Sequence, residues 1–321
     1  MALTEEGIID IPGISSRWVR LANGARAHYS TAGDKGPAVI LVHGGIEGSS
    51  GLAGFRFMIP FLAEHGYRVY APDRPGFGLA DTREEYWPRR AFMSWAQFIK
   101  DFADALCIDE FFLSGNSNGA QTCAYFAVNN PERVIRMPLI ATGGFSNTMG
   151  IDPSKLGKGI ALPAFDGTEA SMQALMDPII YRKEAVSEDL LKMRTMAANK
   201  QADSFGAARK FMREHATDPS YQQQMNLKGR LDKLTIPIVY LFGQNDTFAV
   251  LENAYLQEEA LPNFQVFYVP ECGHQAQTDQ PDIVNQVFLE FLRDGKVSRK
   301  TADAAGVSKR RPENPELVAQ S

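Results

Sequence analysis

The sequence predicts an α/β protein with a mainly parallel central sheet that is flanked by helices. Three observations lead to this prediction. Short, uninterrupted apolar runs such as residues 38–42 (AVILV) have the length of strands and fit strands that are buried on both faces. Segments with apolar residues at helical spacing separate these runs. The alternation stops near residue 145 and resumes at residue 236, which indicates a helical insertion into the fold.

The expected elements follow in chain order. An antiparallel hairpin at residues 17–21 and 25–30 turns at Asn23-Gly24, a favoured hairpin dipeptide. The remaining strands are expected at residues 38–42, 67–71, 111–114, 134–140, 236–242 and 264–269. Helices are expected at residues 57–65, 94–106, 120–128 and 282–293, where apolar residues recur with a helical period or capping residues close the segment.

The chain divides into a discontinuous core and two further segments. The core comprises residues 1–145 and 233–296. Residues 146–232 lack strand-like runs and accumulate methionines, which predicts an inserted helical lid with a pliable apolar wall. Residues 297–321 carry a basic cluster and prolines with little to bury, so they are expected to form a flexible or surface-lying extension.

Composition excludes several classes of protein. The 321 residues are 44% hydrophobic and 22% charged, which is typical of a folded globular chain, and 33 basic against 38 acidic side chains give a net charge of −5. A nucleic-acid or anionic-membrane partner is therefore not expected. Three cysteines without C-x-x-C spacing indicate neither a disulfide framework nor a zinc site, and no metal or cofactor is expected.

The N-terminal segment MALTEEGIIDIPG has acidic residues where a secretory signal would be basic and then apolar. No run approaches the roughly 18 apolar residues of a membrane span. These features predict a cytoplasmic protein whose partner is a small-molecule substrate, and they leave open whether it forms a homo-oligomer.

The pentapeptide Gly115-Asn116-Ser117-Asn118-Gly119 lies between an expected strand and an expected helix. It matches the G-x-S-x-G pattern, in which a tight turn presents a serine hydroxyl above the carboxyl edge of the sheet. The helix N-terminus points backbone N–H groups at the same place, where they can hold an oxyanion. Ser117 is therefore the predicted nucleophile, and the alternative is a surface turn rich in glycine and asparagine.

A serine hydroxyl needs a general base, and the chain has five histidines. His274 follows the last expected strand, so it lies at the same sheet edge as Ser117. Asp246 follows the strand before it and can orient His274 by accepting a hydrogen bond from its other ring nitrogen. Asp279 is the competing carboxylate, and His28, in the hairpin, is expected at the surface.

His43-Gly44-Gly45 follows the strand at residues 38–42. Glycines let the backbone approach a ligand closely. The predicted oxyanion donors are the backbone N–H groups of Gly45 and Asn118, while His43 itself is expected to be a buried structural histidine.

These motifs together resemble the α/β-hydrolase superfamily. They are HGG at 43–45, DRPGFG at 73–78, GNSNG at 115–119, GQND at 243–246 and CGH at 272–274, and the resemblance covers residues 17–294. The chain order serine, aspartate, histidine is also the order in this superfamily. The resemblance implies an α/β-hydrolase fold with a helical lid inserted into it.

Within the superfamily the sequence is most similar to the meta-cleavage product hydrolases, which cut a carbon–carbon bond in the dienoates left by aromatic ring cleavage. Asn116 before the nucleophile, GGF at 143–145 and SEDLLKMR at 187–194 carry this similarity. It implies that Arg194 binds the carboxylate or keto-enol end of the substrate, with Arg182 as the rival.

The other predicted substrate contacts are Gly44, Asn116 and Gln275. Gln275 stands where the family often has a tryptophan, and Asn118 stands where a hydrophobic residue is usual. Gly54 lies near the position of a family asparagine. The two polar replacements predict a more polar pocket than in most members of the family.

Three functions fit these residues. The first is C–C bond hydrolysis of a ring-fission dienoate, and the second is a carboxylesterase or lactonase that uses the same triad. The third is a ligand receptor that keeps the fold with little turnover. A dehalogenase or epoxide hydrolase is disfavoured because those enzymes need a carboxylate nucleophile at the position of Ser117.

Overall fold

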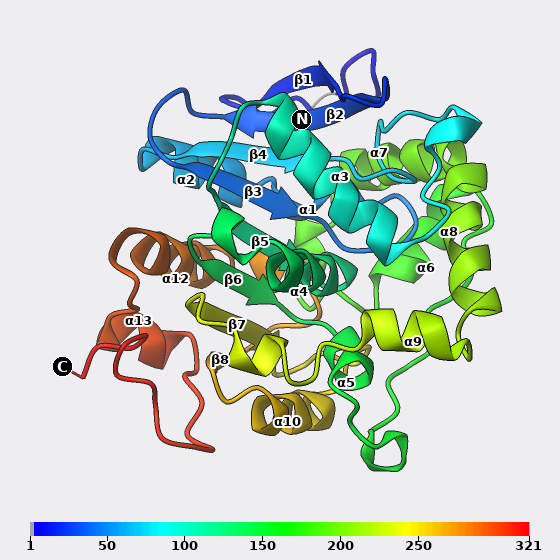
Figure 1. Cartoon of the computed structure of the whole chain (residues 1–321). Helices are drawn as coiled ribbons and strands as arrows, with labels where there is room; N and C mark the ends of the chain where they lie inside the picture. The colour runs from blue at the N-terminus through cyan, green and yellow to red at the C-terminus, as the bar shows by residue number, and fades with distance from the viewer. Residues whose placement is uncertain (1–2, 321) are drawn as a thin grey trace.

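The structure is a computed structural model that describes residues 3–320, and its strands form one eight-stranded sheet with the order β1-β2-β4-β3-β5-β6-β7-β8 (Figure 1). The strands are β1 (Ser15–Arg20), β2 (Arg26–Ala32), β3 (Ala38–Val42), β4 (Arg68–Pro72), β5 (Phe112–Asn116), β6 (Met137–Ile140), β7 (Ile238–Gly243) and β8 (Phe264–Val269). Strand β2 pairs antiparallel with β1 and β4, and all other pairs are parallel. This arrangement confirms the predicted fold class.

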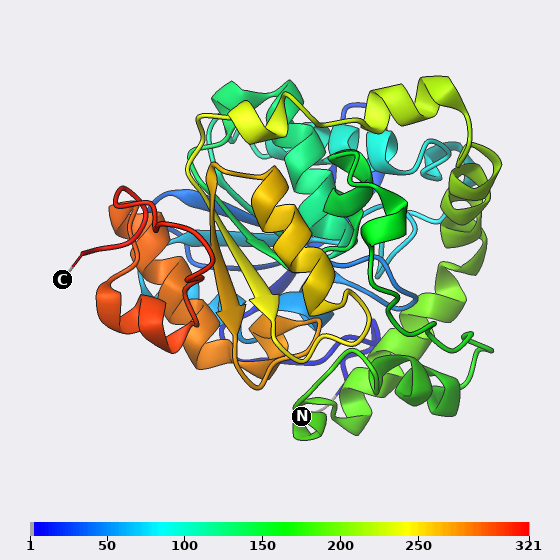
Figure 2. The ribbon, with the colours of Figure 1, turned by 90° about the horizontal axis from the view of Figure 1, so that it is seen from below.

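The five strands β3, β5, β6, β7 and β8 are buried along their whole length. This burial explains why most of their residues are apolar, because helices cover both faces of a parallel sheet. The helices of the core are α1 (Gly51–Phe55), α2 (Met58–Glu64), α3 (Phe92–Ala105), α4 (Asn118–Asn129), α10 (Leu251–Ala260), α11 (Ala276–Asp279) and α12 (Pro281–Asp294). Helices α3, α4 and α10 cover one face, and α2 and α12 cover the other (Figure 2).

The long helix α12 shows how the sequence sets the ends of an element. It begins at Pro281, whose missing N–H is not needed in the first turn. It ends at Gly295, which adopts a left-handed conformation with φ 71° and donates its N–H to the Phe291 carbonyl. Its apolar face, which includes Val284, Val287 and Phe288, is buried against the core.

The segment between β6 and β7 is helical, and Figures 1 and 2 place it beyond the carboxyl ends of the parallel strands. Its helices are α5 (Gly144–Thr148), α6 (Glu169–Met176), α7 (Glu188–Lys200), α8 (Ala202–Glu214) and α9 (Pro219–Met225). No strand occurs in residues 146–232, all of which the structure describes. Two apolar clusters are separate from the main core, and they join this segment, hereafter the insertion, to α3 and to the loops that follow β3, β4 and β7.

The C-terminal segment lies at the opposite end of the molecule from the insertion (Figures 1 and 2). It contains α13 (Arg299–Ala304) and runs along the outer edge of β8, where Val307 bridges Phe267. Val297, Ala302 and Val318 are fully buried. The expectation that this segment has little to bury is therefore wrong, because its three valines and Leu317 are all buried.

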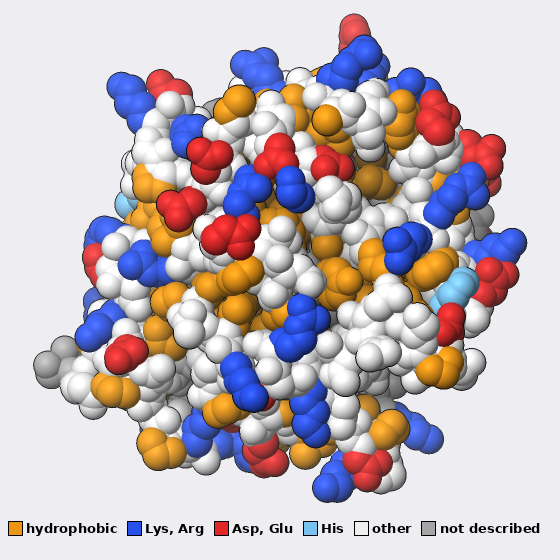
Figure 3. Space-filling view, in the orientation of Figure 1, with side chains coloured by type: hydrophobic (Ala, Val, Ile, Leu, Met, Phe, Trp, Pro, Cys, Tyr) orange, Lys and Arg blue, Asp and Glu red, His pale blue; other side chains and the backbone are white. Residues whose placement is uncertain are grey.

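Acidic and basic side chains are interspersed over the face seen in Figure 3, with apolar side chains showing between them. Among the described residues, no helix combines the length and the apolar character that crossing a membrane requires. The same part of the chain holds no cluster of three or more histidine, cysteine or acidic side chains suited to a metal ion. All three cysteines are free thiols.

Candidate active site

Ser117 lies at the turn between β5 and α4, in a strained conformation with φ 57° and ψ −123°. Its N–H donates to the Ile140 carbonyl at 2.9 Å. Space requires both flanking glycines: a Cβ on Gly115 would lie 2.5 Å from the Gly119 backbone, and one on Gly119 would lie 2.1 Å from the Val42 carbonyl oxygen. The turn holds the half-buried serine at the carboxyl edge of the sheet.

Asp246 and His274 form a buried pair after β7 and β8. Nδ1 of His274 lies 2.6 Å from Oδ2 of Asp246. The other carboxylate oxygen accepts the N–H groups of Phe248 and Ala249, both at 2.9 Å. Three donors thus fix the carboxylate, which in turn fixes the imidazole with Nε2 free for proton transfer.

Asn116 connects the serine turn to the histidine loop. Its Nδ2 donates to the His274 carbonyl at 3.1 Å. Nε2 of His274 is buried and has no hydrogen-bond partner among residues 3–320. The structure therefore brings Asp246 and His274 into contact and ties their loop to the turn that bears Ser117, while the hydrogen bond from Ser117 to His274 stays a prediction. Such catalytic bonds often form only when substrate is bound.

Gly44 and Gly45 pass directly beside the serine turn. A Cβ on Gly44 would lie 3.7 Å from the Ser117 Cβ, and a Cβ on Gly45 would lie 2.6 Å from the Asn118 Cβ. The loop that carries one predicted oxyanion donor therefore packs against the residue that carries the other. His43 is buried as predicted, and burial together with the Arg74 charge lowers its pKa to about 3.

His28 is not at the surface, so that expectation is wrong. It is buried, and its Nδ1 lies 2.7 Å from Oδ2 of Asp73. Its Nε2 meets the Ser16 hydroxyl at 2.9 Å. Burial acts to raise the pKa of Asp73, but the contacts with His28, the nearby His43 and the Leu79 N–H together lower it. Strand β2 is an inner strand and residues 27–30 are buried in succession, so both of its faces are covered, which the hairpin pattern alone does not reveal.

Asp279 is not paired with His274, and the structure gives it another contact set. Its carboxylate accepts the N–H of Gly273 at 2.8 Å and that of Tyr181, in the insertion, at 3.0 Å. The N–H of His274 donates to the Ile179 carbonyl at 2.8 Å. Burial raises the pKa of Asp279. The insertion and the histidine loop are thus bonded to each other around this carboxylate.

Arg194, on α7, is 2% exposed. Its Nη2 donates to the Glu47 carbonyl at 3.1 Å, and its Nε is buried without a partner in the part of the chain that the structure describes. Burial and the nearby Arg56 charge lower the pKa of Arg194 to about 9. Arg182 differs, because its side chain is 45% exposed and pairs with Glu184 at 3.0 Å. Of the two rivals, Arg194 is the buried cation without a carboxylate in contact.

Two of the predicted substrate contacts are engaged inside the protein. The Asn116 side chain is buried between the serine turn and the histidine loop, as described above. Gln275 is buried at the start of α11, where its Oε1 accepts a hydrogen bond from the Thr278 hydroxyl at 3.3 Å. Both residues adjoin a catalytic candidate in the chain, and Asn116 ties the serine turn to the histidine loop.

A cavity of about 390 Å³ opens beside Gly45 and Asn118. Glu47 and Arg209 also line it and form an ion pair at 2.6 Å. The remaining lining is mostly apolar and comes mainly from the insertion, and it comprises Ile46, Trp95, Leu162, Pro163, Ala164, Phe165, Leu175, Phe205 and Met212. Such a lining accommodates an aromatic or aliphatic group next to the predicted oxyanion donors.

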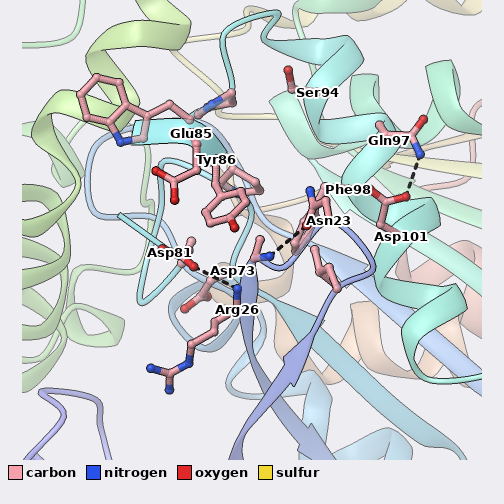
Figure 4. Close-up of a pocket in the computed structure, with 16 residues that line it drawn as sticks. Asn23, Arg26, Asp73, Asp81, Glu85, Tyr86, Ser94, Gln97, Phe98 and Asp101 are labelled. Carbon is pink, nitrogen blue, oxygen red and sulfur yellow. Dashed lines mark hydrogen bonds between the residues drawn. The ribbon is translucent and has the colours of Figure 1, made fainter. Parts of the chain in front are cut away.

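Other cavities lie away from these residues. Figure 4 shows one of about 220 Å³ beside the β1–β2 hairpin, where Asn23, Tyr86 and Phe98 line it. Its three aspartates are already hydrogen-bonded: for example, Asp81 accepts the N–H of Arg26 at 3.0 Å. A larger cavity of about 680 Å³ lies between α4 and the helices α8 and α9 of the insertion. Neither contains a predicted site residue.

Sequence reasoning missed the contacts of Arg74, Glu47 and Arg209. Arg74 stands inside the DRPGFG motif, but nothing in the motif tells where a long side chain ends. Glu47 and Arg209 are 162 residues apart in sequence, so only the fold brings them together. A basic residue directly after Asp73, in a motif that otherwise consists of proline, glycine and phenylalanine, was the available signal for Arg74.

Comparison with protein families gives the same class of protein as the fold and the arrangement of the site. Residues 37–281 match the family model described as the alpha/beta hydrolase fold, and the chain belongs to this family. Within it, the predicted resemblance to the meta-cleavage product hydrolases is confirmed by curated relatives.

One similar protein is the 2-hydroxy-6-oxononadienedioate/2-hydroxy-6-oxononatrienedioate hydrolase of Paraburkholderia phymatum. It is 28% identical over 285 residues, which cover 87% of this chain and 96% of that protein. Another is the 2-hydroxy-6-oxo-6-phenylhexa-2,4-dienoate hydrolase of Burkholderia cepacia, 29% identical over 276 residues, 84% of this chain and 92% of that protein. Among solved structures, the meta-cleavage product hydrolase of Pseudomonas fluorescens superposes with a TM-score of 0.67 at 26% identity, covering 87% of this chain and 98% of that one.

Proposed function

We propose that this protein is a serine hydrolase that cleaves a carbon–carbon bond of a ring-fission dienoate in the breakdown of aromatic compounds. Curated relatives that match most of the chain bear the names of 2-hydroxy-6-oxo dienoate hydrolases. The observation that carries the proposal is the buried Arg194, which bonds the loop after Gly45, because a hydrolase for neutral esters has no need of such a cation.

A buried guanidinium that has neither a carboxylate in contact nor a full set of hydrogen bonds is costly unless a ligand supplies the missing acceptors. Arg194 is in this state, and its Nη2 bonds the carbonyl of Glu47, two residues after Gly45. An arginine fork binds a substrate carboxylate with two parallel hydrogen bonds. We therefore assign Arg194 to the acidic end of the dienoate and the apolar cavity beside Asn118 to its acyl end.

The proposed reaction uses only the side chains and backbone of this chain. After the dienol ketonises, Nε2 of His274 takes the proton of the Ser117 hydroxyl, whose oxygen attacks the ketone carbon. The N–H groups of Gly45 and Asn118 stabilise the resulting oxyanion. Its collapse breaks the carbon–carbon bond and releases a dienolate, which takes a proton from His274. A water deprotonated by His274 then hydrolyses the ester on Ser117 and frees the acid.

A turnover screen of wild type and Ser117→Ala tests this proposal with ring-fission dienoates, aryl esters and lactones. The expected result is loss of the dienoate colour with wild type and a decrease of about 1,000-fold or more in the variant. Rapid cleavage of esters or lactones with inert dienoates would replace the proposal with an esterase or lactonase. Binding of a dienoate without turnover by wild type would favour a receptor.

The role of Arg194 has its own test, with Arg182 as the matched control. Arg194→Gln is expected to reduce kcat/KM for a dienoate about 10- to 100-fold, because one charge-assisted contact is lost. Turnover of a neutral aryl ester is expected to change little. Arg182→Gln is expected to leave both activities near wild type. Equal losses on both substrates in Arg194→Gln would contradict the assignment.

We also propose that the protein acts in the cytoplasm on a small molecule and needs neither nucleic acid nor membrane as a partner. The net charge of −5 and the three free cysteines support this view. Fractionation of cells that express the tagged protein tests the location. Recovery in a membrane or exported fraction would contradict it.

A further inference from the structure

Arg74 is a buried cation that the proposed mechanism does not use. It follows β4, and its side chain is fully buried at 0% exposure. Its guanidinium carbon lies 5.0 Å from the ring centre of Phe77 and 4.9 Å from that of Trp95. Burial lowers the pKa of Arg74 to about 9. Because a charge in this environment needs hydrogen bonds to be tolerated, the groups that accept its protons are informative.

The acceptors of Arg74 lie in two segments only. Nη2 donates to the carbonyl oxygens of His43 and Gly44, both at 2.8 Å. Nη1 donates to Oδ1 of Asn118 at 2.7 Å and to the Thr122 hydroxyl at 3.2 Å. The first segment carries one predicted oxyanion donor, and the second is the start of α4, which carries the other. One guanidinium therefore bridges the two halves of the predicted oxyanion hole.

The contact between Arg74 and the Gly44 carbonyl also fixes the orientation of the next backbone N–H group. The carbonyl of Gly44 and the N–H of Gly45 belong to the same peptide unit, and the described residues contain no cis peptide bond. In a trans peptide these two groups point in opposite directions. A cation held on the Gly44 oxygen thus directs the Gly45 N–H away from Arg74, and it also polarises that N–H into a stronger donor.

We propose that Arg74 is a positioning residue for the oxyanion hole. It orients the Gly45 N–H through the Gly44 carbonyl and fixes the first turn of α4 through the Asn118 side chain. This also gives a role to Asn118, whose amide stands where the family usually has a hydrophobic residue. The inference rests on the proposed chemistry of Ser117 but not on the dienoate, since any acyl transfer to that serine passes through an oxyanion.

Arg74→Lys tests the proposal, with Arg133→Lys as the matched control. Arg133 also donates to a backbone carbonyl, that of Ile108 at 2.7 Å, but it lies at the far end of β5. A lysine keeps the charge and cannot bridge both segments. The expected result for an aryl ester and a dienoate is a kcat lower by about 10- to 100-fold in Arg74→Lys with KM within about two-fold. Arg133→Lys is expected to keep wild-type kcat.

A kcat in Arg74→Lys equal to that of Arg133→Lys, or a rise in KM alone, would overturn the proposal. The rate at which a fluorophosphonate labels Ser117 gives a readout that does not depend on the natural substrate, and it is expected to fall in parallel with kcat.

If Arg74→Lys does not fold, Asn118→Ala provides a second test. This variant removes one acceptor of Arg74 and keeps the backbone N–H donor of residue 118, and a loss in kcat of several-fold is expected. Unchanged labelling and kcat in that folded variant would likewise refute the inference. Inert dienoates with normal labelling of wild type would count against the proposed substrate alone.

Discussion

His43 shows, at the scale of one residue, how burial sets the state of a group beside the site. Its Nδ1 contacts the Gly44 carbonyl oxygen at 2.7 Å, and its Nε2 accepts the N–H of Arg74 at 3.1 Å. This pattern requires the neutral ring with its proton on Nδ1. Burial, followed by the charge of Arg74, lowers the pKa of His43 from 6.5 to about 3. Between these two pKa values, His43 is therefore neutral in the folded protein and protonated in the unfolded chain.

This difference predicts a pH dependence of stability. Because the folded pKa is the lower one, the contribution of His43 is fully present above 6.5 and is lost as the pH falls toward 3. The free energy of unfolding should decrease by about 1.4 kcal/mol for each pH unit in this window. His43→Gln should show a shallower slope in urea denaturation between pH 7.5 and 4.5, while His65→Gln, at an exposed helix end, should match wild type. Parallel slopes in wild type and His43→Gln would contradict the assignment.

At the scale of elements, the insertion and the histidine loop share one buried carboxylate. Asp279 accepts N–H groups from Gly273, Tyr181 and Arg182. It therefore holds the backbone next to His274 in register with the residues that lead into α7. We expect the position of the general base to depend on this junction.

Asp279→Asn is expected to lower kcat about 10-fold. The asparagine amide has one acceptor oxygen in place of two, and its NH2 group would face a backbone N–H that also donates. Limited proteolysis near residue 181 should also become faster, since the junction loosens. Asp152→Asn is the control: its exposed carboxylate accepts the Ser154 N–H at 2.9 Å inside the same insertion, and activity should not change. Wild-type kcat and proteolysis in Asp279→Asn would show that the junction does not matter.

The strands and the serine turn could be predicted because their determinants are local. Continuous apolar runs mark strands that are buried on both faces, and two glycines around Ser117 mark a turn that tolerates no Cβ. The burial of His28 and the contacts of Arg74 and Asp279 could not be predicted in this way. They depend on which distant segments of the chain pack together and on where long side chains then end. A local sequence pattern contains no information on either.

The whole molecule joins a rigid sheet, an insertion over its carboxyl edge, and a C-terminal segment at the far edge strand. That last segment was expected to bury little, since it is short of apolar residues. In the structure it covers the otherwise unpaired edge of β8, and Val297 and Val318 form a parallel bridge within it. A few apolar side chains at the right positions are sufficient for this packing. The number of apolar residues in the segment therefore does not predict whether the segment packs on the core.

Leu317→Ala tests whether this segment stabilises the fold. Leu317 is 5% exposed, so the variant is expected to lose about 2 kcal/mol or more in the free energy of unfolding. Its kcat should stay close to wild type, because the site lies at the opposite end of the strands. Lys309→Ala, at an exposed position of the same segment, should change neither quantity. A stability unchanged in Leu317→Ala, measured by urea denaturation, would show that the segment does not pack as described.

The central claim is that Ser117, Asp246 and His274 act together at one edge of the sheet. Mass spectrometry of the protein after reaction with a fluorophosphonate tests it most directly. We predict a single adduct on Ser117 in wild type and labelling slower by about 1,000-fold or more in His274→Ala. An adduct on another residue, or labelling of Ser117 at the wild-type rate without His274, would contradict the account.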